Sequence, residues 1–204
     1  MALRLKWLLL MNALRIAFYI LFFLTISFHS LKAGPRSTYH VAKEEHMLMR
    51  DKVLKTFSSK LPTEYLAIAG SISDEVMLQS IRYKIEPMMI TAIISGESSF
   101  NPVATGPVGE VGLMQLRPRT ARWIAEKYGI KWRGASALKD PVYNIQLGSA
   151  YLGYLKKKYS PKEGLLYLAA YNMGETSLLR LLSNKISPNI YSSHIMKNYQ
   201  VISI

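Results

Sequence analysis

The sequence predicts a mainly α-helical domain, and three observations support that prediction. Apolar residues recur at spacings of three and four in several segments, which is the period of an amphipathic helix. Half of the 204 residues are hydrophobic, so the chain can bury a substantial core. No run alternates apolar and polar residues strongly enough to predict a sheet, although a small hairpin within residues 100–115 fits the pattern.

The first 33 residues predict export from the cytoplasm. Basic residues at positions 4, 6 and 15 are followed by thirteen uncharged, mostly apolar residues, 16–28, as in a signal peptide. The longer stretch 7–28 could instead span a bilayer as an uncleaved anchor, although Asn12 and Arg15 interrupt it. With either fate, the basic end stays in the cytoplasm and the rest of the chain crosses the membrane.

Residues 34–79 are expected to form a helical spacer or N-terminal extension, and residues 80–204 the main domain. Helices are expected over 39–57, 63–69 and 73–83. Pro62 breaks the first of them, and Ser73 suits the N-terminal cap of the third.

Residues 85–99 predict the helix that carries the chemistry. Pro87 suits its first turn. Four residues share one face: Ile90, Ile93, Ile94 and Glu97. Because that face is otherwise apolar, we expect Glu97 to be partly desolvated, which raises the pKa of its carboxyl. A protonated carboxyl beside a cleft is what a general acid for glycosidic bond cleavage needs, whereas a Glu97 turned to solvent would have no such role.

Loop and helix signals alternate through the remaining sequence. Glycines and prolines make 100–112 a loop. Asp140 and Pro141 are expected to cap and begin a long structural helix. The other helices are expected over 118–128, with Gly129 as its stop, and over 164–172, 175–182 and 190–204.

Charge and cysteine content exclude some kinds of function. A net charge of +13 favours anionic partners, but the basic residues are scattered and no nucleic-acid-binding motif stands out. The absence of cysteine excludes disulfides, thiolate catalysis and Cys-ligated zinc. The four histidines show no metal-ligand spacing, so we expect neither a metal site nor a nucleic-acid partner.

Four separated pieces of the sequence occur in the order found in one enzyme family. They are Glu97-Ser98, Asn101-Pro102, the loop Gly109-x-x-Gly112-Leu113-Met114-Gln115, and Ala170-Tyr171-Asn172-Met173-Gly174. Together they resemble the soluble lytic transglycosylase (SLT) domain of peptidoglycan-cleaving enzymes, relatives of goose-type lysozymes. The resemblance covers roughly residues 80–200. It implies a lysozyme-like helical domain whose catalytic cleft lies between the Glu97 helix end and the Tyr171–Asn172 helix.

The resemblance also implies roles for single residues. Glu97 would be the catalytic acid and base. The residues that it places on the glycan are Ser98, Met114, Gln115, Tyr171, Asn172 and Tyr199. Ser98 could instead cap a carbonyl, as a serine at a helix end often does. Tyr199 is the first match to a further family tyrosine and Tyr191 the second, because residues 192–197 depart from the types that usually precede that tyrosine.

The activity implied is cleavage of the β-1,4 bond between N-acetylmuramic acid and N-acetylglucosamine, with a 1,6-anhydro product and no cofactor. The partner implied is the peptidoglycan glycan strand. We expect a monomer in the bacterial periplasm or cell envelope, with inner-membrane contact if the N-terminal segment is retained.

Two alternative functions stay open. Glu110 sits where the family usually has a small residue, and a carboxylate there could hold a water and make the enzyme a lysozyme-like hydrolase. The expectation is that Glu110 is an exposed loop acid. The protein could also bind glycan without cleaving it, as a component of an envelope-spanning machine, but the presence of Glu97 and Gln115 favours an enzyme.

Overall fold

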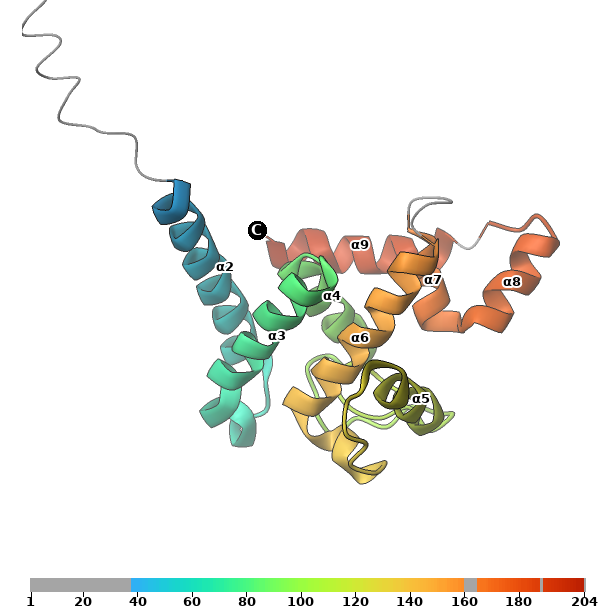
Figure 1. Ribbon diagram of the computed structural model, residues 1–204, viewed down its shortest axis with the longest axis horizontal. Helices are drawn as coiled ribbons and strands as arrows, with labels where there is room; N and C mark the ends of the chain where they lie inside the picture. Colours follow the sequence, from blue (N-terminus) through green and yellow to red (C-terminus); the bar gives the residue numbers. More distant parts are fainter. Residues whose placement is uncertain (1–37, 160–164, 188, 204) are drawn as a thin grey trace, which may run out of the picture. The chain divides into compact units, whose positions relative to one another are not determined.

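The computed structural model describes residues 38–159, 165–187 and 189–203 (Figure 1). Its elements in chain order are α2 (Thr38–Lys60), the 3-10 helix η1 (Thr63–Ile68), α3 (Ala69–Tyr83), α4 (Pro87–Ser98), α5 (Pro118–Tyr128), the 3-10 helix η2 (Ser136–Lys139), α6 (Pro141–Tyr159), α7 (Leu166–Met173), α8 (Glu175–Ser183) and α9 (Asn189–Ser203). The predicted signal or anchor, residues 1–33, lies outside the described residues. Within the described ranges, no helix is both long enough and apolar enough to cross a bilayer.

The chain divides into two units, residues 1–46 and 47–204, and α2 spans the point of division. In the second unit, Val53 and Phe57 of α2 are fully buried and belong to the main hydrophobic core. The predicted domain boundary at residue 80 falls inside α3, and it stays a prediction.

Helix α6 is the central helix of the second unit, because it packs against α3, α5 and α7. Figure 1 shows it running between these helices. Its side chains enter two hydrophobic clusters. Ile145, Leu152 and Leu155 belong to the main core, and Tyr143, Leu147 and Ala150 belong to a smaller core shared with α5. Any residue on α6 is therefore placed rigidly with respect to both cores.

Helix α4 packs against α3 and α9. The contact with α9 is close at Gly96, where a Cβ atom would come within 2.8 Å of Cδ1 of Ile195 and 3.1 Å of Nδ2 of Asn198. The absence of a side chain at Gly96 therefore lets α9 lie directly on α4.

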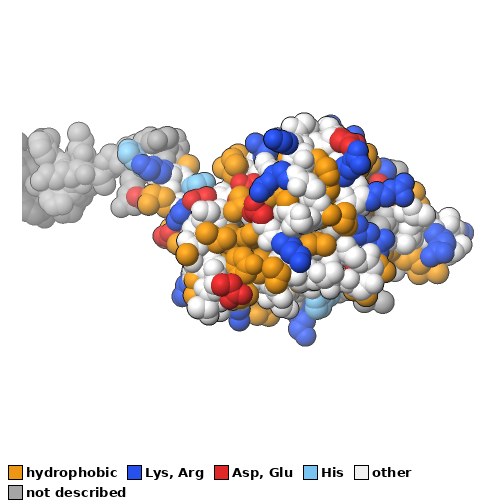
Figure 2. Space-filling model, turned by 90° about the horizontal axis from the view of Figure 1, so that it is seen from below, with side chains coloured by type: hydrophobic (Ala, Val, Ile, Leu, Met, Phe, Trp, Pro, Cys, Tyr) orange, Lys and Arg blue, Asp and Glu red, His pale blue; other side chains and the backbone are white. Residues whose placement is uncertain are grey.

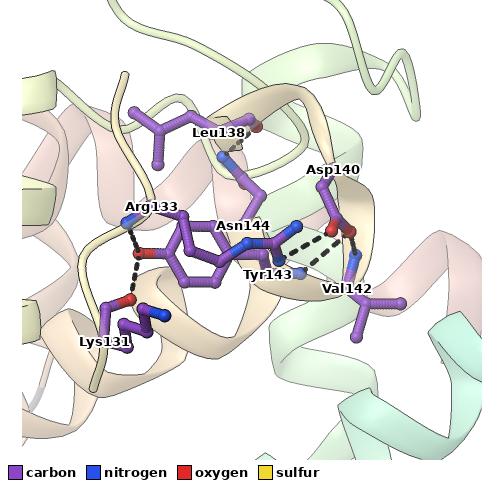
Figure 3. A network of polar contacts seen from close by, with 7 residues as sticks. All are labelled: Lys131, Arg133, Leu138, Asp140, Val142, Tyr143 and Asn144. Atoms are coloured by element: carbon purple, nitrogen blue, oxygen red, sulfur yellow. Dashed lines mark hydrogen bonds and ion pairs between the residues drawn. The ribbon is translucent and has the colours of Figure 1, made fainter. Parts of the chain in front are cut away.

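Three predicted helix ends are confirmed. Pro87 opens α4, and Gly129 ends α5 in a left-handed conformation with φ of 65°. Asp140 caps α6, because its Oδ1 atom accepts the N–H groups of Val142 at 3.1 Å and Tyr143 at 3.2 Å (Figure 3).

The predicted cap at Ser73 is wrong. Helix α3 begins at Ala69, and its N-cap, Ile68, makes no side-chain capping bond. Ser73 is buried inside the helix, and its hydroxyl donates to the carbonyl of Ala69 at 2.9 Å. Ser73 is therefore an interior residue of α3, and the backbone of that helix satisfies its hydroxyl.

Strand pairing around the predicted hairpin is limited to two isolated antiparallel bridges, Thr105 with Val111 and Val111 with Leu116. On the surface, Figure 2 shows Lys and Arg side chains spread over one face and interleaved with hydrophobic and neutral ones. This distribution agrees with their scatter along the sequence.

Candidate active site

Glu97 lies in the last turn of α4 and is half-buried. The three apolar residues predicted to share its face, Ile90, Ile93 and Ile94, are fully buried. The predicted inward face of this helix is therefore confirmed. Glu97 stands where that face reaches the end of the helix.

The end of α4 is fixed by two residues in left-handed conformations. Ser99 and Phe100 have φ angles of 49° and 64°, which stop the helix at Ser98, one residue after the acid. Phe100 is then buried edge-to-face against Phe57, with ring centroids 5.3 Å apart. The acid is thus held on a helix end that is anchored in the core.

The loop after α4 is held by one side chain of α6, Asn144. Its Oδ1 atom accepts the N–H of Met114 at 2.8 Å, and its Nδ2 atom donates to the carbonyls of Val111 and Leu138, both at 2.9 Å. Figure 3 shows Asn144 reaching Leu138 from α6. Because Asn144 is fully buried, these bonds replace bonds to water, and they fix the part of the loop that leads to Gln115.

Two glycines let this loop and α6 approach each other. A Cβ atom at Gly112 would lie 2.3 Å from the Leu138 carbonyl oxygen and from Nδ2 of Asn144. A Cβ atom at Gly148 would lie 2.4 Å from Sδ of Met114. The glycine of the loop motif and the glycine of α6 therefore serve the same contact.

Gln115 turns its amide back onto its own loop. Its Nε2 atom donates to the carbonyls of Ala104 at 3.1 Å and Gly112 at 2.8 Å. The backbone of Gln115 has φ of 44°, a conformation that few residues other than glycine adopt. The donors of this amide stabilise the loop, and the side chain lines the pocket described below.

Tyr171 of α7 lies near Glu97. Its hydroxyl donates to the carbonyl of Met114 at 2.8 Å. Burial raises the pKa of Tyr171 well above its ordinary value, and the negative charge of Glu97 raises it further. The carboxylate of Glu97 is therefore within the range of an electrostatic effect on the phenol. The structure therefore brings the acid, Tyr171 and the Met114 loop together.

A pocket opens beside Tyr171. Its lining residues are Glu110, Gln115, Leu116, Arg117, Thr120, Tyr151, Tyr171, Asn172, Met173 and Gly174. Three of the residues predicted to bind glycan thus share one pocket: Gln115, Tyr171 and Asn172. Asn172 is exposed, so its amide can reach a ligand. Among the residues that the structure describes, no three His, Asp or Glu side chains gather closely enough to hold a metal ion.

Glu110 lines the same pocket and is not the freely exposed acid that its loop position predicts. Its Oε1 atom accepts a hydrogen bond from Nε of Arg117 at 3.0 Å, and its Oε2 atom accepts the N–H of Val108 at 3.1 Å. Partial burial acts to raise the pKa of Glu110, but the bonds from backbone N–H groups and from Arg117 outweigh it and lower the pKa. Glu110 is therefore an ionised carboxylate engaged in an ion pair.

Two further predicted residues have side chains turned to internal partners. The Ser98 hydroxyl donates to the carbonyl of Ile94 at 3.1 Å, which is the alternative expected of a helix-end serine. Met114 is fully buried, with its Sδ atom 3.9 Å from the Ser149 hydroxyl. The backbone of Met114 holds Asn144 and Tyr171, whereas its side chain fills the core. Their placement does not favour direct glycan contact by either side chain.

Tyr199 is not brought to the Glu97 end of α4. Its hydroxyl donates to both carboxylate oxygens of Glu86, each at 2.7 Å. Glu86 is the N-cap of α4, about 16 Å along the helix from Glu97. This position does not favour the expected place of Tyr199 in the cleft. Tyr191, the second match, lies in the first turn of α9, and its side chain lies outside the described residues.

Tyr151 is a pocket residue that the motifs do not predict. It lies two helical turns after Asn144, on the same side of α6, and its ring is 5.4 Å from that of Tyr171. Burial raises the pKa of Tyr151 to about 12, with a smaller effect from the charge of Glu175, so its hydroxyl stays protonated near neutral pH. The signal in the sequence is the pair Tyr151-Leu152, which resembles part of the family's helix after the Gln loop and is interpreted there as structural.

Comparison with known families gives a match over most of the second unit. Residues 77–193 match the family described as the transglycosylase SLT domain. This span contains Glu97, Gln115 and Tyr171. It also contains Tyr191 and ends before Tyr199.

Similar sequences include two enzymes named as membrane-bound. The chain is 34% identical over 137 residues to the endo-type membrane-bound lytic murein transglycosylase A of Klebsiella pneumoniae, covering 56% of this chain and 66% of that protein. It is 33% identical over 133 residues to the membrane-bound lytic murein transglycosylase C of Haemophilus influenzae, covering 60% of this chain and 37% of that protein. The chain thus spans less than two thirds of the length of each relative.

Similar solved structures confirm the predicted fold class. The 70-kDa soluble lytic transglycosylase of Escherichia coli matches 67% of this chain with a TM-score of 0.53 and 26% identity, over 25% of its own length. An inactive Glu-to-Gln variant of lytic transglycosylase Slt from Pseudomonas aeruginosa matches 63% of this chain with a TM-score of 0.52 and 28% identity, over 22% of its own length. The second unit therefore has the helical, lysozyme-like fold of these enzymes.

Proposed function

Because the chain belongs to the transglycosylase SLT domain family, we propose that it is a peptidoglycan lytic transglycosylase. The observation that supports this proposal best is the position of Glu97. It is half-buried on an anchored helix end, near Tyr171, and Tyr171 lines an open pocket. The bond cleaved is the β-1,4 bond between N-acetylmuramic acid and N-acetylglucosamine in the glycan strand.

In the first step, Glu97 in its protonated form donates its proton to the glycosidic oxygen that leaves. The bond between that oxygen and the anomeric carbon of the muramic acid breaks, and positive charge develops on this sugar. The substrate's own N-acetyl carbonyl stabilises that charge, because substrate-assisted cleavage needs no second carboxylate. The ion pair that Glu110 makes with Arg117 suits a mechanism with one acid.

In the second step, Glu97 is ionised and takes the proton of the 6-hydroxyl of the same sugar. The 6-oxygen forms a bond to the anomeric carbon, which closes the 1,6-anhydro ring. The proton returns to Glu97, so the enzyme ends as it began and no water is consumed. Tyr171 has a raised pKa and keeps its proton throughout, so its bond to Met114 holds the loop in place beside the acid.

The amide-bearing residues of the pocket supply specificity for acetylated sugars. Asn172 is exposed in the pocket and can both donate to and accept from an N-acetyl group. Gln115 lines the same pocket, with its donors engaged by the loop. Tyr191 is the candidate for the further tyrosine at the start of α9.

The cell compartment follows from the substrate. We propose that the protein is exported and acts as a monomer on glycan strands in the bacterial periplasm or envelope. Residues 1–33 would either be removed as a signal peptide or retain the protein at the inner membrane. The names of the two membrane-bound relatives support a place in the envelope.

The proposal is tested by mass spectrometry of purified peptidoglycan after incubation with the protein. Anhydro-ended fragments are expected from the wild type and from Glu126→Gln, because Glu126 is exposed on α5 and pairs only with Arg122 among the contacts resolved there. Glu97→Gln should release none. Fragments heavier by one water would instead identify a hydrolase and direct attention to Glu110. No fragments from folded wild type would contradict catalysis and favour a glycan-binding role.

A further inference from the structure

The pocket at Tyr171 and Asn172 continues into a neighbouring one. The second pocket is lined by Arg119, Thr120, Trp123, Tyr151, Gly174 and Glu175. Thr120, Tyr151 and Gly174 line both pockets. The two are therefore parts of one groove, which runs from the Gln115 loop to the outer side of α5.

Trp123 stands at the far end of this groove and is 40% exposed. The opposite side of α5 is anchored by three fully buried residues, Ala121, Ile124 and Ala125. The indole meets the ring of Tyr154 edge-to-face, with centroids 5.0 Å apart and planes at 82°. The Lys127 ammonium lies 5.5 Å from the indole centroid. An exposed aromatic side chain is thus held in one orientation before any ligand arrives.

Polar groups around the indole are also held in place. Glu175 accepts a hydrogen bond from the Tyr159 hydroxyl at 2.9 Å and one from the Lys158 ammonium at 2.5 Å. Tyr151 keeps a protonated hydroxyl at the point where the two pockets meet. The groove therefore offers an aromatic surface flanked by fixed hydrogen-bonding groups.

This combination matches the chemistry of a sugar ring. A pyranose has an apolar face of C–H groups that packs on an aromatic ring, and a polar edge of hydroxyl groups that needs hydrogen-bond partners. We propose that Trp123 is the platform of a distal subsite, on which an N-acetylated sugar stacks beyond those held at Tyr171 and Asn172. This inference rests on the proposed function, because it takes the same glycan strand as its ligand.

A purely structural role for Trp123 would be packing against Tyr154 without any ligand contact. Trp132 provides the comparison, since it is half-buried, packs against the smaller core and lines neither of the two pockets. A structural tryptophan and a sugar platform differ in one measurable property. Only the platform should change its fluorescence and control affinity when an oligosaccharide binds.

The test measures binding of the hexasaccharide of N-acetylglucosamine by the full chain carrying Glu97→Gln, which removes turnover. Tryptophan fluorescence should change on titration, and Trp132→Phe should retain that change whereas Trp123→Phe should abolish it. Trp123→Ala should weaken binding about tenfold, which corresponds to the loss of one good aromatic contact. Trp123→Phe keeps a ring and should lose less, so it preserves the test if the alanine variant has a lowered melting temperature.

Three outcomes would overturn the subsite. They are equal affinity of Trp123→Ala and its parent, a fluorescence change that survives Trp123→Phe, and no binding of the hexasaccharide by the parent. Failure of the proposed function appears differently. If Trp123 controls binding but the wild type releases no fragments from peptidoglycan, the subsite stands and catalysis does not. If the wild type cleaves and both Trp123 variants cleave with unchanged KM, catalysis stands and the subsite does not.

Discussion

Replacement of Asn144 by Asp changes one atom at the point that holds the Gln115 loop. The Oδ1 atom could still accept the N–H of Met114. The Nδ2 atom, which donates to the carbonyls of Val111 and Leu138, would become an oxygen. Two carbonyl oxygens that now receive a hydrogen bond would then face a third oxygen.

The size of the effect follows from burial. Asn144 is fully buried, so water cannot replace the two lost donors. Loss of the donor to the buried Leu138 carbonyl costs about 1–3 kcal/mol. The Val111 carbonyl still accepts the N–H of Leu116, so loss of its second bond costs about 0.5–1.5 kcal/mol, which gives a total of about 1.5–4.5 kcal/mol at neutral pH. That total is a large fraction of the roughly 5–15 kcal/mol by which a domain is stable.

The loss of unfolding free energy in Asn144→Asp should depend on pH. Burial and the two facing carbonyls disfavour the charged form, so the introduced carboxyl should have a pKa in the folded state above its unfolded value of about 3.9. When the folded pKa is the higher one, stability is greatest below the unfolded pKa and falls as pH rises through the folded pKa. A protonated carboxyl can also donate one of the two missing bonds. The difference in unfolding free energy between wild type and variant should therefore widen from acid to neutral pH.

Urea unfolding followed by circular dichroism at several pH values measures this difference. Asn184→Asp is the matched control, because Asn184 is exposed and follows α8, and its effect should stay within about 0.5 kcal/mol. An Asn144→Asp variant as stable as that control at neutral pH would refute the role given to Asn144. A difference that does not shrink on acidification would refute the electrostatic reasoning.

Two further substitutions test the two tyrosines, Tyr171 and Tyr199, that the sequence predicts at the site. Tyr171→Phe removes the donor to the Met114 carbonyl, so it should lower the unfolding free energy by about 0.5–1.5 kcal/mol. It should also reduce fragment release from peptidoglycan at least tenfold in a folded protein. Full activity in the variant would contradict a role for this bond. Tyr199→Phe removes only the exposed bond to Glu86, so the rate of fragment release should change less than about twofold, and a large loss would return Tyr199 to the site.

Features that depend on neighbouring residues in the sequence were predictable. Pro87, Gly129 and Asp140 mark helix ends because a proline ring, a left-handed glycine and a capping carboxylate act within one turn. The inward face of α4 was predictable for a related reason, since its apolar residues recur at the helical period.

Features that depend on contacts between distant parts of the chain could not be predicted from the sequence. Glu110 and Arg117 are seven positions apart, and they pair only because the loop turns back on itself through two isolated bridges. Tyr199 lies near Glu86 because α9 packs along α4, and no local pattern encodes where two helices meet. Tyr151 lines the pocket for the same reason, because its position depends on how α6 packs against its neighbours.

The packing of α9 on α4 also sets the order in which the site can be completed. Gly96 and its partner Ile195 are separated by about 100 positions, a contact of long range in the chain. During synthesis, the helix that bears Glu97 therefore emerges well before the helix that covers it. A chain still on the ribosome therefore has Glu97 on an unfinished scaffold. The finished arrangement forms only after residues 195–198 have arrived, so the completion of this domain is timed by its last helix.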